Sequence, residues 1–268
     1  MFGNLLRAEF KKVRFMHVGL ACAAFYAVVA LIYLFAHDGS WVSAPAPDGR
    51  GWWGFLPDPT YDLVFAESGY PLDRAVACAS VAHTVFFPVI ALAFVHQLYF
   101  ADLQGRGAQV AFARGASRFR FLCAKLAAAT VVLQGCYLLF SIATAAVYLA
   151  VCQPASLASA VGALGGKLLL NCLVNESFIV FCMGVFSWVD NGPAATGIVF
   201  VSTIVGLVAQ LAMGGVDLPV HMGYWVKASG SSIEPAVALS TAAFSLASFA
   251  LFAVAAYGGM LRGEGRRA

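Results

Sequence analysis

Four polar side chains in an otherwise apolar stretch are the residues of this sequence best suited to chemistry inside a membrane. Lys167, Asn171 and Asn175 recur at every fourth position, and Glu176 follows directly. A charged group near the middle of a bilayer costs at least ~2.5 kcal/mol on insertion scales, which makes Glu176 a candidate for lining a translocation path or relaying a proton. Alternatively, Asn171, Asn175 and Glu176 hydrogen-bond across a helix interface and only set its packing. The sequence leaves both alternatives open.

An intramembrane enzyme would need more than these groups. A site built from Glu176 and His83 requires a second acid or a set of metal ligands at a matching depth, and the sequence offers neither. His83 and His96 lie about 20 Å apart along a helix, too far to share a metal ion. The seven cysteines form no CxxC pair and are typical of small buried apolar residues. We therefore predict no catalytic residue and no metal site.

One segment, GALGGKL at residues 162–168, resembles a phosphate-binding loop. The motif G-x-x-x-x-G-K-[ST] needs a glycine where Val161 stands and a hydroxyl where Leu168 stands. The sequence thus predicts no nucleotide site and no cofactor bound to this chain.

The composition indicates an integral membrane protein. Of the 268 residues, 61% are hydrophobic and only 11% are charged, whereas soluble domains carry about 25% charged residues. We predict one all-α transmembrane domain over residues 1–268. A helix needs ~20 apolar residues to cross a bilayer, and such runs predict six spans, at residues 15–36, 75–100, 122–151, 167–188, 194–214 and 236–260. Residues 152–166 and 215–235 are predicted as connections, the second apolar enough to dip back into the membrane.

The first 14 residues predict an amphipathic helix that lies in the membrane surface, with cations facing anionic lipid. Its apolar face comprises Phe2, Leu5, Leu6, Phe10 and Val13. Glu9 is unexpected because it falls inside this apolar arc. We expect Glu9 either to pair with Lys12 or with a cation between residues 106 and 120, or to reach the water at the lipid headgroups.

A long external loop is predicted over residues 37–74. Its prolines exclude one long helix. Its many aromatic residues predict a segment that lies at the membrane interface. Contact with a substrate is the alternative role.

A basic, glycine-broken insert occupies residues 101–126. Its charged residues are Asp102, Arg106, Arg114, Arg118, Arg120 and Lys125. Gly105, Gly107 and Gly115 divide it into short pieces, and Ser117 suits the N-cap of the next helix. The insert fits a solvated loop, a lipid-binding basic patch, or a short helix that docks on a partner. The apolar residues 110–113, between glycines and next to cations, suit the last of these.

The cations of the chain are distributed unevenly about the predicted spans. Six spans place both termini and the insert on one side, which holds twelve of the sixteen Lys and Arg residues. The positive-inside rule therefore predicts that both termini and the insert are cytoplasmic.

Two motifs resemble the permeases of type-two ABC exporters. The opening LLRAEFKKVR is similar to their leader, a leucine pair followed by Ala-Glu-Phe and spaced cations. The insert is similar to their loop between spans two and three, with Asp102 at its start, a short coupling helix, the turn Gly115-Ala-Ser117-Arg118, and Lys125 opening span three. Size and the six-span layout most resemble permeases of lantibiotic-immunity and bacitracin-type exporters. The long aromatic loop at 37–74 departs from the usual form.

This resemblance implies a mechanism and a set of partners. A cytoplasmic ABC ATPase dimer, which would hold ATP and Mg, would bind two permease chains, identical or related, in a bacterial-type plasma membrane. Its closure would move the coupling helix at about residues 107–114, within the cytoplasmic coupling loop 101–121. The residues implied in coupling are Val110, Phe112, Arg114, Ser117 and Arg118, with Glu9 and Lys12 joining the leader helix to the insert. The chain would export a peptide, antibiotic or lipid-like substrate, without contact with nucleic acid. The alternative is a membrane anchor or sensor that recruits a cytoplasmic partner through the same basic loop.

Overall fold

A computed structural model describes residues 2–13, 52–53, 56–57, 87–152, 157–212, 220–229 and 235–262. The predicted first span (15–36), most of the predicted external loop (37–74) and His83 lie outside the described residues.

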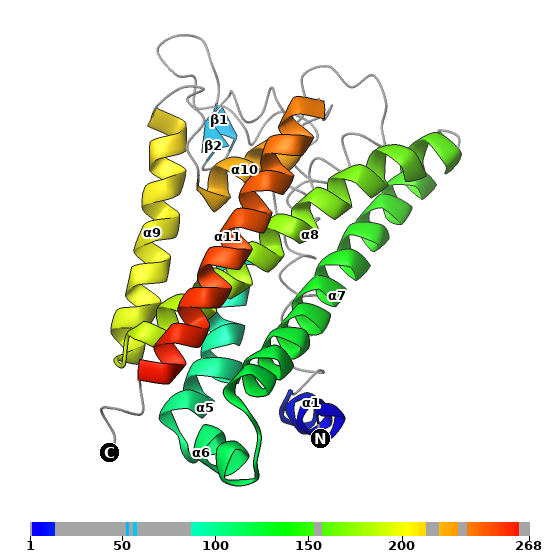
Figure 1. The fold of residues 1–268 in the computed structure, drawn as a ribbon. Helices are drawn as coiled ribbons and strands as arrows, with labels where there is room; N and C mark the ends of the chain where they lie inside the picture. Colours follow the sequence, from blue (N-terminus) through cyan, green and yellow to red (C-terminus); the bar gives the residue numbers. More distant parts are fainter. Residues whose placement is uncertain are drawn as a thin grey trace.

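The described part of the chain is almost entirely helical (Figure 1). The helices are α1 (Phe2–Lys12), η1 (His96–Phe100), α5 (Ala101–Gln104), α6 (Arg106–Ala113), α7 (Arg118–Cys152), α8 (Leu157–Trp188), α9 (Gly192–Ala212), α10 (His221–Ser229) and α11 (Pro235–Arg262). Residues 87–95 are also α-helical and continue into η1, a π-helical turn, and then into α5. Two short strands, β1 (Trp52–Trp53) and β2 (Leu56–Pro57), pair antiparallel, with Trp52 opposite Pro57.

Three helices are long and apolar enough to cross a membrane. These segments are Arg118–Ile142 of α7, Gly165–Trp188 of α8 and Pro235–Arg262 of α11. They overlap the segments predicted at 122–151, 167–188 and 236–260. The apolar part of α9, Gly192–Gly206, is shorter. The structure is therefore that of an all-helical protein with membrane-type helices.

Two connections predicted from the sequence contain helix instead. The predicted loop 152–166 is wrong from residue 157 onward, because α8 begins at Leu157. Small residues suggested a loop there, but alanine and leucine are strong helix formers, and Pro154 precedes the helix in the sequence. Within the predicted connection 215–235, residues 221–229 form α10, whose Trp225 is fully buried.

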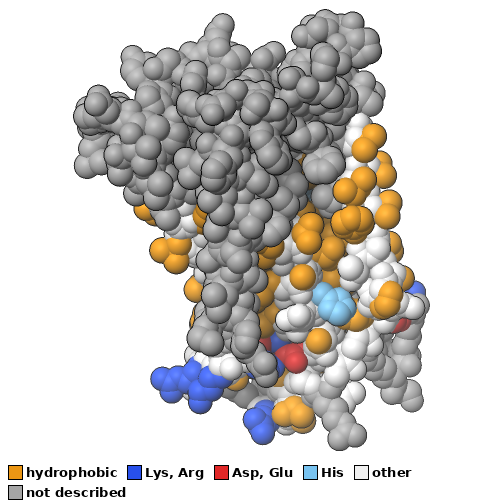
Figure 2. All heavy atoms as spheres, turned by 180° about the vertical axis from the view of Figure 1, so that it is seen from behind, with side chains coloured by type: hydrophobic (Ala, Val, Ile, Leu, Met, Phe, Trp, Pro, Cys, Tyr) orange, Lys and Arg blue, Asp and Glu red, His pale blue; other side chains and the backbone are white. Residues whose placement is uncertain are grey.

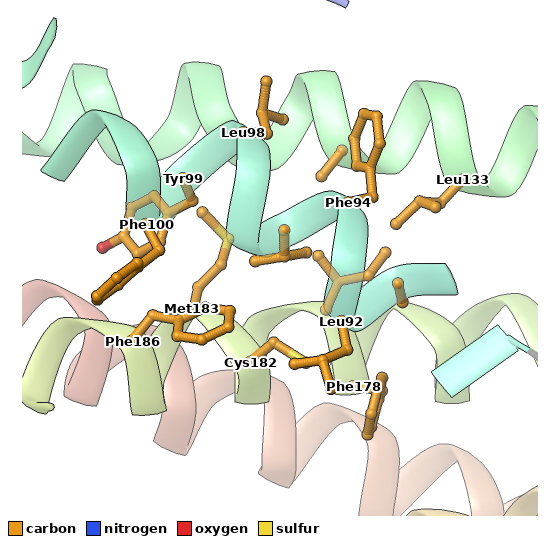
Figure 3. Close-up of a cluster of buried hydrophobic side chains, with 14 of the residues drawn as sticks. Leu92, Phe94, Leu98, Tyr99, Phe100, Leu133, Phe178, Cys182, Met183 and Phe186 are labelled. Carbon is orange, nitrogen blue, oxygen red and sulfur yellow. The ribbon is translucent and has the colours of Figure 1, made fainter. Parts of the chain in front are cut away.

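Helix α8 is the centre of the packing. It crosses α11 closely, since a Cβ added to Gly259 would lie 2.6 Å from the backbone oxygen of Ser187. On its other side, α8 packs against the helical segment 87–104 through a cluster of buried side chains (Figure 3). The labelled members of this cluster on α8 are Phe178, Cys182, Met183 and Phe186, and they face Leu92, Tyr99 and Phe100. This packing fixes the helical segment that leads into α5 and α6.

The two ends of the helices differ. Helices α1, α5 and α6 lie together at one end, and α10 lies toward the other (Figure 1). Figure 2 shows Lys and Arg side chains gathered at the α1 and α6 end, beneath helices whose sides carry hydrophobic side chains. We call this the charged end.

Candidate functional site

Helix α6 is a separate short helix at the charged end, and local signals define both of its ends. Gly105 is extended and precedes it. After Arg114, Gly115 adopts φ 81°, a left-handed conformation that glycine adopts without a steric penalty. The amide of Gly115 donates to the Phe112 carbonyl, and that of Ala116 donates to the Ala111 carbonyl, at 2.9 and 3.1 Å. This is a Schellman ending, which terminates α6 and turns the chain toward α7.

The start of α7 is capped as the sequence predicts. The Ser117 hydroxyl accepts a hydrogen bond from the Arg120 amide at 3.3 Å. This bond satisfies one of the free N–H groups of the first helical turn. Gly115 and Ser117 together therefore make a sharp, defined joint between α6 and α7.

One face of α6 is packed and the other is exposed. Ala108 is buried, and the Phe112 ring packs edge-on against Phe121 of α7 with centroids 5.3 Å apart. The Arg118 guanidinium lies over the Phe112 ring, 5.9 Å from its centroid. Val110, 45% exposed, and Arg114 lie on the open face. An exposed apolar residue next to a cation suits docking on a partner surface.

Four charged side chains from three helices meet beside α6, and we call them the ion cluster: Glu9, Lys12, Asp102 and Lys125. The Lys125 ammonium, at 0% exposure, hydrogen-bonds both the Glu9 and the Asp102 carboxylates. Lys12 Nζ lies 2.6 Å from Asp102 Oδ2 and 3.2 Å from Glu9 Oε1. Two acids and two lysines balance one another, as buried charges require.

The ion cluster also holds the backbone of the π-helical turn. Lys125 Nζ donates to the Leu98 carbonyl, 2.6 Å away, inside η1. π-Helical turns are rare in proteins overall, and those that do occur are often found at functional sites. Through this one lysine, α7 is joined to α1, to α5 and to the helical segment 87–104.

Helix α6 touches the ion cluster through a glycine. A Cβ added to Gly107 would lie 2.6 Å from Asp102 Oδ1, so the Asp102 carboxylate packs directly on the α6 backbone. The α6 backbone, Asp102 and both lysines therefore form a continuous chain of contacts.

Asp102 and Lys12 are held in their charged forms. Both lie outside the helices that are long enough to span a membrane. Burial disfavours the Asp102 carboxylate, but hydrogen bonds and charge from Lys12 and Lys125 outweigh this effect and lower its pKa. Burial likewise disfavours the Lys12 ammonium, but Asp102 and Glu9 outweigh it and raise the Lys12 pKa. Both shifts keep the ion pair charged at neutral pH.

The structure explains why an acid stands on the apolar face of the first helix. Glu9 is 1% exposed and points into the protein, where Leu5, Leu6 and Phe10 pack beside it against the core. It pairs with Lys12, one of the partners expected from the sequence. Its second partner, Lys125, belongs to the insert 101–126 but lies outside residues 106–120, where a cation was expected, because the first turns of α7 face α1.

The polar residues of α8 form a second group with α7 and α10. Asn175 accepts a hydrogen bond from Trp225 Nε1 at 2.8 Å and donates to Gln134 Oε1 at 3.2 Å. Glu176 accepts from Thr130 Oγ1 at 2.5 Å and from Gln134 Nε2 at 3.3 Å. These contacts join three helices, as a packing role requires.

Asn171 differs from its neighbours on α8. It is fully buried, and neither its amide nitrogen nor its oxygen has a hydrogen-bond partner in the described structure. Lys167, one turn earlier, is also buried. Among the predicted path-lining residues, Asn171 therefore has an amide without a hydrogen bond in the described structure. Asn175 and Glu176 are both hydrogen-bonded to neighbouring helices.

Sequence reasoning named several members of these groups and missed others. Asp102 and Lys125 were named as charged residues of the insert and as motif positions, but not as partners of Glu9. No contact was predicted for Trp225, and Gln134 and Thr130 were not singled out. A signal existed for Gln134, an amide in the middle of an apolar run. Among the described residues, no three His, Cys, Asp or Glu side chains are grouped so that they could hold a metal ion.

Comparison with known proteins does not assign the chain to a family. No protein-family model matches the chain, and no curated protein matches it.

Proposed function

We propose that this chain is the membrane-spanning permease subunit of an ABC exporter. A separate cytoplasmic ATPase dimer hydrolyses ATP, and the chain couples that hydrolysis to export of a peptide, antibiotic or lipid-like substrate. The chain itself contributes no catalytic residue. Two copies, or two related chains, associate to form the complete membrane part.

The observation that carries this proposal is the construction of α6. It is an eight-residue helix between Gly105 and Gly115, with Val110 and Arg114 on its open face. Its packed face touches α7 through Phe112, and its backbone touches the ion cluster at Gly107. A partner that pushes on the open face would move α6 as a small rigid body. Its contacts reach α7 through Phe112, and α5 and α1 through the ion cluster.

The ion cluster gives the proposed movement a route into the membrane helices. Displacement of Asp102 would alter its bonds to Lys12 and Lys125, and Lys125 holds α7 to the Leu98 carbonyl. Buried ion pairs have few alternative arrangements, since an unpaired buried charge is costly. We infer that α1, α7 and the segment 87–104 move together when the ATPase closes.

The proposed topology has six spans with both termini and α6 in the cytoplasm, in the plasma membrane of a bacterial-type cell. The spanning segments of α7, α8 and α11 supply three of them. The gathering of cations at the charged end supports this orientation, and the amphipathic α1 would lie along the cytoplasmic membrane surface.

Affinity purification of the tagged chain from its native membranes tests the proposal. We expect an ABC ATPase to co-purify and Arg114→Glu to abolish its capture, because the substitution reverses a charge on the open face of α6. Arg7→Glu is the matched control: it makes the same charge change on exposed α1 and should retain the ATPase. Arg118→Glu should uncouple ATP hydrolysis from transport, and neither Arg114→Glu nor Arg118→Glu should prevent membrane insertion.

The same experiment separates the alternative function. A membrane anchor or sensor would capture a cytoplasmic partner that is not an ATPase, and Arg114→Glu would release that partner. Absence of any ATPase from the wild-type complex would refute the permease proposal.

A further inference from the structure

A cavity of about 430 Å³ lies between α8, α9, α10 and α11, away from the charged end. Its volume falls in the range of about 300–1,000 Å³ that small-molecule sites occupy. Four phenylalanine side chains line it: Phe178 and Phe181 come from α8, and Phe244 and Phe252 come from α11. Phe181 and Phe252 pack edge-on, with centroids 4.8 Å apart.

Two exposed residues of α11, Ala247 and Leu251, line the cavity, and Leu251 is 64% exposed. They lie in the middle of α11, which is long and apolar enough to cross a membrane. A molecule would therefore reach the cavity from the hydrocarbon of the bilayer.

Four polar side chains line the cavity, and the described lining contains no Asp, Glu, Lys or Arg. They are Ser202 and Thr203 of α9, His221 of α10 and Ser248 of α11. An uncharged lining in apolar surroundings disfavours a charged ligand, because a buried charge without a counter-charge is costly.

The hydroxyl protons of α9 are already used. Ser202 and Thr203 both donate to the Val199 carbonyl, each at 2.8 Å. A hydroxyl has one proton to donate and two lone pairs to accept with. Both side chains therefore offer the cavity acceptors only.

On the opposite wall, His221 Nε2 and Ser248 Oγ hydrogen-bond each other at 3.3 Å. Either atom can be the donor of this bond, because the imidazole tautomer decides the direction. The side of the cavity formed by α9 therefore offers hydrogen-bond acceptors, and the polar pair on the opposite wall is already bonded.

We propose that this cavity binds an uncharged, membrane-dissolved molecule with an apolar body and a hydrogen-bond donor, such as a hydroxyl group. The aromatic side chains contact the body, and the hydroxyl oxygens of Ser202 and Thr203 accept the hydrogen bond from the donor. This proposal does not rest on the exporter function, since it concerns binding by the chain alone.

Photolabelling of the purified full chain in lipid nanodiscs tests it with two matched probes. One is a long-chain alcohol that bears a diazirine, and the other is its methyl ether, which keeps the chain but cannot donate. We expect the alcohol to label α9 or α11 at the cavity, saturably and in competition with unlabelled alcohol, about 3- to 10-fold more than the ether, as one hydrogen bond predicts. Equal labelling by the two probes would overturn the proposal.

Two variants locate the label. Ala247→Trp fills the mouth of the cavity from an exposed position and should abolish saturable labelling. Ala243→Trp, one turn earlier on α11, makes the same change on an exposed residue outside the cavity lining and should leave labelling intact. Saturable labelling that survives Ala247→Trp would contradict a small-molecule site in this cavity.

Discussion

At the scale of the residue, Lys125 is the side chain on which the charged end depends most. It is fully buried and holds two carboxylates and one backbone carbonyl at once. Removing one partner of a buried ion pair is far more costly than removing both, because the remaining charge is left in an apolar environment. The lysine therefore specifies one arrangement of α1, α5 and α7 rather than simply adding stability.

This asymmetry predicts the outcome of a double-mutant cycle. Lys125→Met should lower the free energy of unfolding by about 3 kcal/mol, because Glu9 remains buried with only Lys12 beside it. Adding Glu9→Gln should restore much of the lost free energy of unfolding, because the double variant no longer buries the Glu9 carboxylate without the Lys125 ammonium. Thermal unfolding in detergent, followed by the fluorescence of a thiol-independent dye, would measure both.

A matched control for this cycle lies on α1, the helix that carries Glu9. Lys11 is exposed, and Lys11→Met should change stability by less than about 0.5 kcal/mol. If Lys125→Met proved as stable as the wild type, or if Glu9→Gln worsened it, the ion cluster would not be the constraint that we describe.

At the scale of the element, the joint between α6 and α7 is the feature most sensitive to a single backbone change. Gly115→Ala places a Cβ at φ 81°, which costs about 1–2 kcal/mol, and should loosen the end of α6. Gly115→Asn should cost less, because asparagine tolerates the left-handed region. Hydrogen exchange of the amides of residues 110–116 would report the difference.

Gly135 supplies the control for this prediction. It lies within α7, and a Cβ added there would meet nothing within 4 Å, so Gly135→Ala should leave exchange in α6 unchanged. Slower exchange in the Gly115→Ala variant than in the wild type would contradict the assigned role of the turn.

The elements also show how much of this fold a sequence can predict. Long apolar runs locate α7, α8 and α11, because only a helix satisfies its own backbone within a membrane. Glycines and Ser117 locate the ends of α6, because their preferences are local. The ion cluster depends instead on residues 9, 102 and 125, which only tertiary packing brings together.

The cavity was beyond sequence reasoning for the same reason. Its polar residues are dispersed over α9, α10 and α11, and each one alone is unremarkable in an apolar helix. The fact that Ser202 and Thr203 already donate their protons to the Val199 carbonyl can be read only from the hydrogen bonds of the folded chain.

At the scale of the whole molecule, the described surface divides into a charged end and apolar sides. Leu239 and Val254 of α11 are 73% and 72% exposed. A soluble protein rarely exposes apolar residues along a whole helix, whereas lipid or a second copy of the chain would cover them. This division supports a bilayer around α7, α8 and α11.

The orientation of that bilayer is the prediction on which the coupling proposal depends. In a variant without native cysteines, Arg114→Cys should react with a membrane-impermeant maleimide in inverted vesicles but not in intact cells, because α6 would face the cytoplasm. Asp48→Cys, in the predicted external loop, should show the reverse pattern and controls for access of the reagent. Reaction of Arg114→Cys in intact cells would place α6 where no ATPase could reach it. The open face of α6 would then have to serve an external partner, and the exporter mechanism would fail.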